Sequence, residues 1–214
     1  MLLILARHGN TFAPDARVVW AGRKQDFPLV EKGHQQARAL AKHLKENKCI
    51  PEVVYCSPLL RTRQYAQIVI SEMDLALTPE VDHRLSEIDY GLWGGLDNQQ
   101  IREQFGGDKL DAWNKRSIWP TDCDWGQSEE EIISETMSFL ATLISNTRSN
   151  QRVLVVTSNG RLRYFLKAVP GEFEKRVETE HFKVATGNYC KMIYENKKWQ
   201  IEAWNQSSSD GGKE

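Results

Sequence analysis

The chain has 214 residues and a mass of 24.6 kDa, enough to bury a substantial core in one large domain or two small ones. Hydrophobic residues make up 40% of it and charged residues 27%, the proportions of an ordinary globular protein. The net charge of −1 excludes a global field that would recruit nucleic acid or an anionic membrane, so any site for an anion must be built locally.

The four cysteines are scattered along the chain, at positions 49, 56, 123 and 190. None forms a CxxC pair, and none has a metal-like spacing to histidine. Four thiols in a chain of this length do not make a disulfide framework, which favours a reducing compartment. The apolar start MLLILA is too short for a signal-peptide core, and no run approaches the length of a membrane span. We therefore expect a cytoplasmic protein.

The first part of the chain alternates short apolar runs with helical patterns. Residues 2–6 and 52–56 are apolar runs typical of buried strands. Between them, residues 31–47 place alanine and leucine side chains on one face at helical spacing. A second helix is predicted to follow, with Ser57 as its N-cap and Pro58 at its first position.

The segment from about 91 to 127 does not fit this alternation, because it is rich in glycine and tryptophan. We predict that it leaves the sheet as a small cap-like excursion with one or two short helices. Its four tryptophans stand at positions 93, 113, 119 and 125. Packing of these side chains onto the core is favoured over contact with a substrate.

The alternation resumes after the excursion. The stretch SEEEIISETMSFLATLI opens with a capping box, Ser128 to Glu131, and continues as an amphipathic helix. Residues 152–157 are predicted to form a strand, and NYCKMIY and KWQIEAW a closing hairpin. A polar tail over 206–214 is predicted to be disordered. Apolar strands separated by amphipathic helices predict an α/β fold, with a mostly parallel central sheet flanked by helices on both faces.

The ends of the predicted strands carry the candidate site. The first strand ends at Arg7 and His8, and the second leads into the helix that carries Arg61. The strand over 152–157 is followed by Ser158 and Asn159. In open α/β sheets, ligands bind beyond the carboxyl ends of the strands. Because arginine forks match phosphate oxygens and helix N-termini favour negative charge, this convergence predicts a phosphate pocket.

His8 is the candidate nucleophile. Of the five histidines it alone stands at a strand end beside an arginine; the others, with surface or structural roles expected, are His34, His43, His83 and His181. A neutral imidazole can attack phosphorus and hold the phosphoryl group covalently, so that one displacement becomes two. Adjacent arginines would stabilise the charge on the group in transfer.

Five stretches resemble the motifs of the histidine phosphatase superfamily, also called the phosphoglycerate mutase-like superfamily. They are LARHGNT, PLVEKGHQQARALAKHL, VYCSPLLRTRQYA, RLSEIDYGLWGG and VLVVTSNGRLRYFL. The match in order and spacing runs from residue 2 to about residue 204. The resemblance implies the phosphoglycerate mutase-like fold in a single domain over 1–205, with the excursion at 91–127 inside it.

The resemblance also implies roles for individual residues. His8 matches the nucleophile that becomes phosphohistidine, and Arg7 and Arg61 match phosphate-binding arginines. Glu87 matches the general acid that protonates the leaving oxygen, a task suited to a carboxyl group with a raised pKa. Neither a metal nor a cofactor is implied, because the arginines neutralise the phosphoryl charge. The expected partner is a small phosphorylated molecule, and the residues make no prediction of oligomeric state.

The last motif departs from the family pattern S-H-G-G-x-x-R. Aligning Arg163 with its final arginine puts Ser158 where a second catalytic histidine belongs and Asn159 in the next glycine position. Both remain candidate phosphate-binding groups. Loss of a charge-assisted hydrogen bond from that histidine costs about 1.5–3 kcal/mol, or roughly one to two orders of magnitude in rate. Pro14 and Gln127 are smaller departures, where many relatives carry asparagine and glutamate.

The leading hypothesis is a metal-independent phosphomonoesterase of reduced activity that acts through phospho-His8 on a small phosphorylated metabolite. The missing histidine motivates an alternative, a non-catalytic or weakly active member that binds a phosphorylated ligand. A phosphoglycerate mutase is the less favoured alternative. The excursion offers only three weak candidates to clamp a carboxylate-bearing phosphate, Lys109, Lys115 and Arg116.

Overall fold

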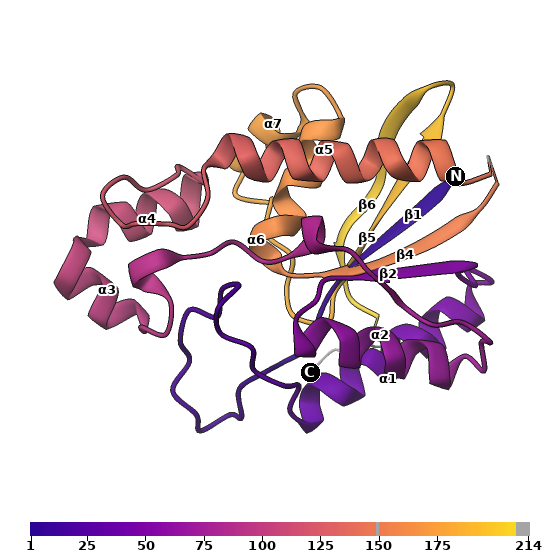
Figure 1. The fold of residues 1–214 in the computed structure, drawn as a ribbon, viewed down its shortest axis with the longest axis horizontal. Helices are drawn as coiled ribbons and strands as arrows, with labels where there is room; N and C mark the ends of the chain where they lie inside the picture. Colours follow the sequence, from indigo (N-terminus) through magenta and orange to yellow (C-terminus); the bar gives the residue numbers. More distant parts are fainter. Residues whose placement is uncertain (149, 209–214) are drawn as a thin grey trace.

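A six-stranded sheet forms the centre of the computed structural model, which describes residues 1–148 and 150–208 (Figure 1). The strand order is β3-β2-β4-β1-β5-β6. The parallel strands are β1 (Leu2–Arg7), β2 (Val53–Cys56), β3 (Glu80–Val81) and β4 (Arg152–Thr157). The predicted hairpin is formed by β5 (Tyr189–Glu195) and β6 (Lys198–Gln206), which join antiparallel at one edge. The predicted α/β fold with a mostly parallel sheet is confirmed.

Helices cover both faces of this sheet (Figure 1). On one face lie α1 (Glu31–Glu46) and α2 (Leu60–Glu72), and on the other α5 (Glu129–Asn146), α6 (Asn159–Leu162) and α7 (Glu172–Glu178). Along β1, Ile4 packs toward α1 and α2, whereas Leu3 and Leu5 pack toward α5. All three are fully buried, which stabilises the sheet by about 1.5–3 kcal/mol per side chain.

Local sequence determines where α5 begins but not where α2 begins. In α5 the predicted capping box is confirmed, since Glu131 N donates to Ser128 Oγ at 3.2 Å and Ser128 N to Glu131 Oε2 at 2.7 Å. The predicted start of α2 at Ser57 is wrong, because the helix begins at Leu60. Asp26 Oδ1, from a distant loop, accepts from Leu60 N at 2.6 Å and takes the capping role. The Ser57 hydroxyl accepts from Leu59 N at 3.4 Å, before the helix begins, and lies 2.7 Å from the hydroxyl of Thr62.

The glycine- and tryptophan-rich segment contains two helices, α3 (Asn98–Phe105) and α4 (Gly107–Arg116), which project beyond one end of the sheet (Figure 1). Trp93 and Trp113 are buried, and Trp125 lies between them with ring centroids 5.3 and 4.8 Å away. Trp119 contacts Trp125 at 4.8 Å. The predicted excursion and the predicted packing role of its tryptophans are confirmed.

The end of the chain and its cysteines complete the fold. β6 includes Gln206, so the ordered sheet extends one residue into the predicted tail. The remainder of the tail from residue 209 lies outside the described residues. The four cysteines are free thiols. Among the helices described, none is both long and apolar enough to cross a membrane.

Candidate active site

The parallel register of β1 and β4 brings the strand-end residues to one edge of the sheet. Arg7 pairs with Thr157, and His8 N donates to Thr157 O at 3.0 Å. Ser158 therefore follows the strand beside the one that His8 follows. The loop after His8 approaches α1 so closely that a Cβ on Gly9 would lie 2.6 Å from the Gly33 backbone. Glycine at that position of the R-H-G tripeptide is thus required by packing.

The hydrogen bonds of His8 determine which ring nitrogen is available to a ligand. Nδ1 lies 2.8 Å from the carbonyl of Gly9, which can only accept, so Nδ1 carries the hydrogen and Nε2 carries the lone pair. Arg61 Nε donates to Nε2 at 3.2 Å. The ring is only 6% exposed. Burial, followed by the positive charges of Arg61 and Arg7, lowers the pKa of His8 well below 6.5, so the ring is neutral at pH 7.

This lowered pKa makes the stability of the fold depend on pH. Below pH 6.5 the unfolded chain binds a proton on His8 and the folded protein does not, so acid favours unfolding. The free energy of unfolding is expected to fall by up to about 1.4 kcal/mol per pH unit between pH 6.5 and the folded-state pKa. Urea denaturation of wild type and His8→Asn at pH 7, 6 and 5 measures this contribution. His181→Asn, at an exposed position, should keep the wild-type slope, and an equally steep slope in His8→Asn contradicts the prediction.

Arg61 is fully buried, and most of its guanidinium group is already occupied. Nη1 donates to Gln25 O at 2.7 Å, and Nη2 donates to Ala21 O at 3.0 Å and Gly22 O at 3.2 Å. The arginine fork therefore holds the loop over residues 21–25, and Nε is the group directed at His8. The sequence-based expectation of a fork open to phosphate oxygens does not match this geometry. A phosphoryl group on His8 Nε2 would still lie beside Arg61 Nε.

Two buried polar atoms at the strand ends have no hydrogen-bond partner among the described residues, Arg7 Nε and Ser158 Oγ. Ser158 is only 1% exposed. Arg7 Nη1 donates to Val184 O at 2.7 Å, and Val184 N donates to Asn159 Oδ1 at 2.9 Å. The side-chain oxygen of Asn159 thus anchors a neighbouring backbone segment. An unpaired buried polar atom costs about 1–3 kcal/mol, so a ligand with acceptor oxygens would be stabilised here.

Glu87 is held against α6 on the same edge. It is 4% exposed, its Oε1 accepts from Ile88 N at 2.8 Å, and its Oε2 accepts from Gly160 N at 3.1 Å. A Cβ on Gly160 would lie 2.3 Å from Glu87 Oε1 and 2.5 Å from the Tyr90 hydroxyl, so glycine alone permits this approach. Burial raises the pKa of Tyr90 well above 10, which keeps its hydroxyl protonated.

Three basic residues that lie near the site were given no site role from the sequence. Arg161 is fully buried and donates to Glu135 Oε2 at 2.6 Å and to Ser86 O at 2.9 Å, beside Glu87. Arg163, 2% exposed, lies with its Cζ 4.0 Å from the ring centroid of Trp113. Lys183 Nζ donates to Asn114 Oδ1 at 3.4 Å. Arg161 and Arg163 stand in the otherwise apolar stretch RLRYFL. Two charged residues within a buried stretch were the signal in the sequence that could have identified them.

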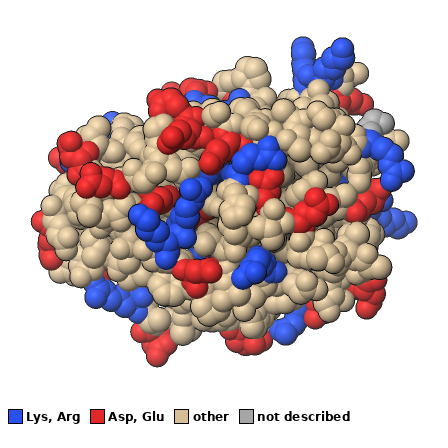
Figure 2. All heavy atoms as spheres, in the orientation of Figure 1, with Lys and Arg blue, Asp and Glu red and all other residues tan. Residues whose placement is uncertain are grey.

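The basic residues of the excursion lie elsewhere. Lys109 donates to Thr121 O at 3.0 Å and pairs with Asp122 at 3.7 Å, and Lys115 and Arg116 are exposed. On the face shown in Figure 2, basic and acidic side chains are interspersed. Among the described residues, no three His, Cys, Asp or Glu side chains are grouped closely enough to hold a metal ion.

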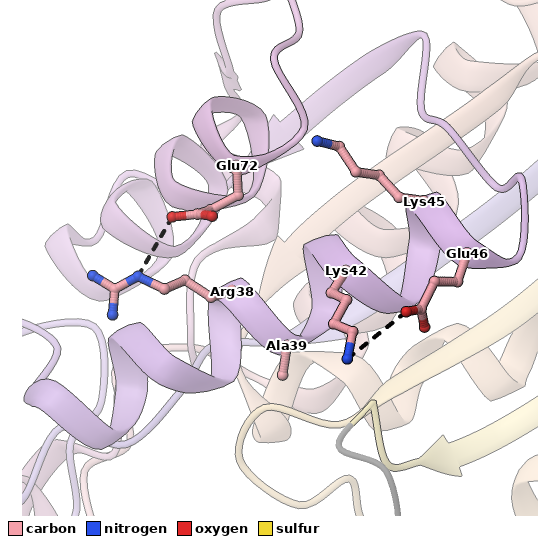
Figure 3. A pocket seen from close by; sticks show the side chains of 6 residues that line it. All are labelled: Arg38, Ala39, Lys42, Lys45, Glu46 and Glu72. Atoms are coloured by element: carbon pink, nitrogen blue, oxygen red, sulfur yellow. Dashed lines mark ion pairs between the residues drawn. The ribbon is translucent and has the colours of Figure 1, made fainter.

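Two surface hollows lie outside the strand-end cluster. One, of about 560 Å³, runs along the C-terminal half of α1, where Arg38 pairs with Glu72 at 3.4 Å and Lys42 with Glu46 at 3.8 Å (Figure 3). The other, of about 390 Å³, borders the segments that carry Arg61 and Glu87. Its lining residues are Arg23, Asp26, Pro58, Leu59, His83, Arg84, Ser86 and Glu135. Neither hollow includes His8.

Comparison with known proteins identifies the family to which the chain belongs. The family model described as "Histidine phosphatase superfamily (branch 1)" matches residues 3–207. A 2,3-bisphosphoglycerate-dependent phosphoglycerate mutase from Methylobacterium radiotolerans is 30% identical over 178 residues, which cover 82% of each chain.

Solved structures of similar fold include two named phosphatases. A mycobacterial glucosyl-3-phosphoglycerate phosphatase has a TM-score of 0.78 and 22% identity, over 96% of this chain and 99% of that one. An alpha-ribazole phosphatase from Shigella flexneri has a TM-score of 0.74 and 23% identity, over the whole of both chains. At these identities the two structures establish the fold.

Proposed function

The chain belongs to branch 1 of the histidine phosphatase superfamily, and we propose that it is a phosphomonoesterase that acts through a phosphohistidine on His8. The observation that carries this proposal is the state of that ring, which is neutral and buried, and which Gly9 O orients so that the Nε2 lone pair accepts from Arg61 Nε. A nucleophilic nitrogen needs its lone pair. The bond between Nδ1 and Gly9 O leaves that lone pair on the nitrogen that faces Arg61.

In the first step, the lone pair of His8 Nε2 forms a bond to phosphorus, and the bond from phosphorus to the ester oxygen breaks. Arg61 Nε, released from Nε2, donates to a phosphoryl oxygen instead, and Arg7 Nε supplies a second donor. The leaving oxygen takes a proton from Glu87, so that an alcohol departs rather than an alkoxide. The positive charges of the arginines stabilise the charge on the group in transfer.

In the second step, water attacks phosphorus and the bond to Nε2 breaks. Glu87, now a carboxylate, takes the proton of the water, which restores its acid form and releases inorganic phosphate. Ser158 Oγ, buried and without a partner in the described part of the chain, donates to a phosphoryl oxygen throughout. It does so as a neutral hydroxyl, which is a weaker donor than a protonated imidazole.

Chemical trapping of the intermediate tests this function. The protein is mixed with a phosphomonoester labelled with radioactive phosphorus and quenched in base, where phosphohistidine survives, or in acid, where it hydrolyses. We expect base-stable, acid-labile label in wild type and in His181→Ala, and none in His8→Ala. Label that persists in His8→Ala, or no label together with no phosphate release, contradicts the proposal.

The mutase named among the relatives raises a second candidate function, phosphoryl return to the substrate rather than to water. The two outcomes share the first step and differ in what attacks phospho-His8. Incubation with 3-phosphoglycerate and 2,3-bisphosphoglycerate separates them, since a mutase makes 2-phosphoglycerate faster than it releases phosphate. We expect phosphate release to be the faster process.

Restoring an imidazole at position 158 is expected to raise turnover. Ser158→His would add a charged donor to the phosphoryl group, for a gain of about 1.5–3 kcal/mol, or roughly one to two orders of magnitude in kcat. Initial rates with a panel of phosphomonoesters measure it, and Ser158→Asn, which adds bulk without charge, is the matched control. An equal change in both variants would mean that the pocket is built around the serine hydroxyl.

A further inference from the structure

Positive side chains gather around three consecutive residues that contact Arg7 and Arg163, namely Phe182, Lys183 and Val184. The Phe182 ring centroid lies 4.9 Å from Arg163 Cζ, and the next residue is Lys183. Val184 O accepts from Arg7 Nη1 at 2.7 Å. The strand-end arginine and two further cations are therefore arranged around a single backbone segment.

These cations lack carboxylate partners. Within residues 1–148 and 150–208, no carboxylate oxygen lies within 4.0 Å of Arg7, Arg163 or Lys183. Arg161 shows the contrast, since this equally buried guanidinium has Glu135 at 2.6 Å. Burial of a cation without an anion is costly unless a ligand supplies one.

The hydrogen bonds of Arg163 are also incomplete. Its Nη1 donates to Ser117 Oγ at 3.0 Å, and its buried Nε has no partner among the described residues. The rings of Trp113 and Phe182 attract the guanidinium through cation–π contact but accept no conventional hydrogen bond. A guanidinium has five N–H donors, so Arg163 retains capacity for an anionic oxygen.

The charges at the site exceed what one phosphate can balance. Four cations, Arg7, Arg61, Arg163 and Lys183, accompany Glu87, which holds its proton before the first step of the proposed mechanism. Two further carboxylates, Glu129 near Arg163 and Glu180 near Lys183, lie beyond ion-pair distance of them. A phosphate monoester dianion would balance two of the four positive charges. Burial and the charges of Arg163 and Arg7 lower the pKa of Lys183, against the opposing effect of Glu180. The cluster of side chains therefore carries an excess of positive charge.

We propose that Arg163 and Lys183 bind a second acidic group, a carboxylate or a second phosphate, on the substrate. The inference rests on the proposed function, which places the first phosphate at His8 and Arg7. Trp113 and Asn114, consecutive residues of α4, contact Arg163 and Lys183 and hold the two cations in place. The excursion thereby selects small phosphorylated acids or bisphosphates over neutral phosphomonoesters.

Calorimetric binding of three phosphonates tests this inference without turnover, because phosphonates are not hydrolysed. The compounds are 3-phosphonopropionate, 1,3-propanediyl bisphosphonate and the neutral-ended 3-hydroxypropylphosphonate. At 0.15 M salt, wild type is expected to bind one or both of the first two at least about tenfold more tightly than the third. The carboxylate and phosphonate arms identify which acidic group is preferred. Equal binding of all three overturns the inference.

Two variants test which residues cause the preference for a second acidic group. Lys183→Met, at a partly exposed position, is expected to reduce the preference to less than about threefold, and Arg163→Met to do the same if its thermal midpoint shows that it folds. Lys115→Met, exposed on α4, is the matched control and should keep the full preference. A preference unchanged in Lys183→Met overturns the inference. A protein that discriminates among phosphonates but forms no phosphohistidine contradicts only the proposed function, and the reverse result contradicts only this inference.

Discussion

Replacing His8 with alanine is expected to lower kcat/KM for phosphomonoester hydrolysis by about 10³-fold or more. The variant loses the atom that bonds to phosphorus, and no other described histidine ring contacts Arg61, so water would have to attack directly. Arg7 and Arg61 remain, and their charge supports a residual rate. Steady-state phosphate release from an alkyl phosphate measures the effect.

The control for this variant separates chemistry from folding. His8→Ala removes a buried ring, so its far-ultraviolet circular dichroism and thermal midpoint should be compared with wild type before the rates are interpreted. His181→Ala changes an exposed histidine and should keep wild-type activity. Equal, slow phosphate release by wild type and His8→Ala would show that the protein is a phospholigand-binding member without this chemistry.

Glu87→Gln is expected to have an effect that depends on the leaving group. Hydrolysis of an alkyl phosphate, whose alkoxide needs a proton to depart, should slow by about 10²–10⁴-fold. Hydrolysis of p-nitrophenyl phosphate, whose phenolate leaves without a proton, should slow far less. The substitution retains the size of a side chain that is 4% exposed and still accepts from Ile88 N through one oxygen. Parallel kcat measurements with the two substrates give the comparison.

The matched control is Glu130→Gln, an exposed carboxylate on α5. It should leave both rates unchanged. If Glu87→Gln slows the two substrates by the same factor, Glu87 does not protonate the leaving oxygen, and its buried carboxylate has the structural task of holding Gly160 and α6 against the sheet. A wild-type rate on the alkyl phosphate in Glu87→Gln would exclude both roles.

Much of the fold was predictable because it depends on short-range pattern. The β-branched run of β4 and the apolar run of β1 are buried on both faces, as continuous apolar runs predict. The capping box of α5 joins residues three apart, so both partners are visible in the sequence. The start of α2 was not predictable, because its capping carboxylate, Asp26, comes from 34 residues upstream.

The sequence by itself determined the strand-end placement of Arg7, His8 and Ser158, since residues that follow parallel strands meet at one edge of the sheet. Only the tertiary structure decided how those groups are used. Three backbone carbonyls occupy the Arg61 fork, and Val184 joins Arg7 across 177 residues of sequence. Contacts between distant segments also bring Arg163 and Lys183 to the neighbourhood of Arg7. Contacts between distant segments leave no periodicity in a sequence, so the charge excess at this site is evident only once the chain is folded.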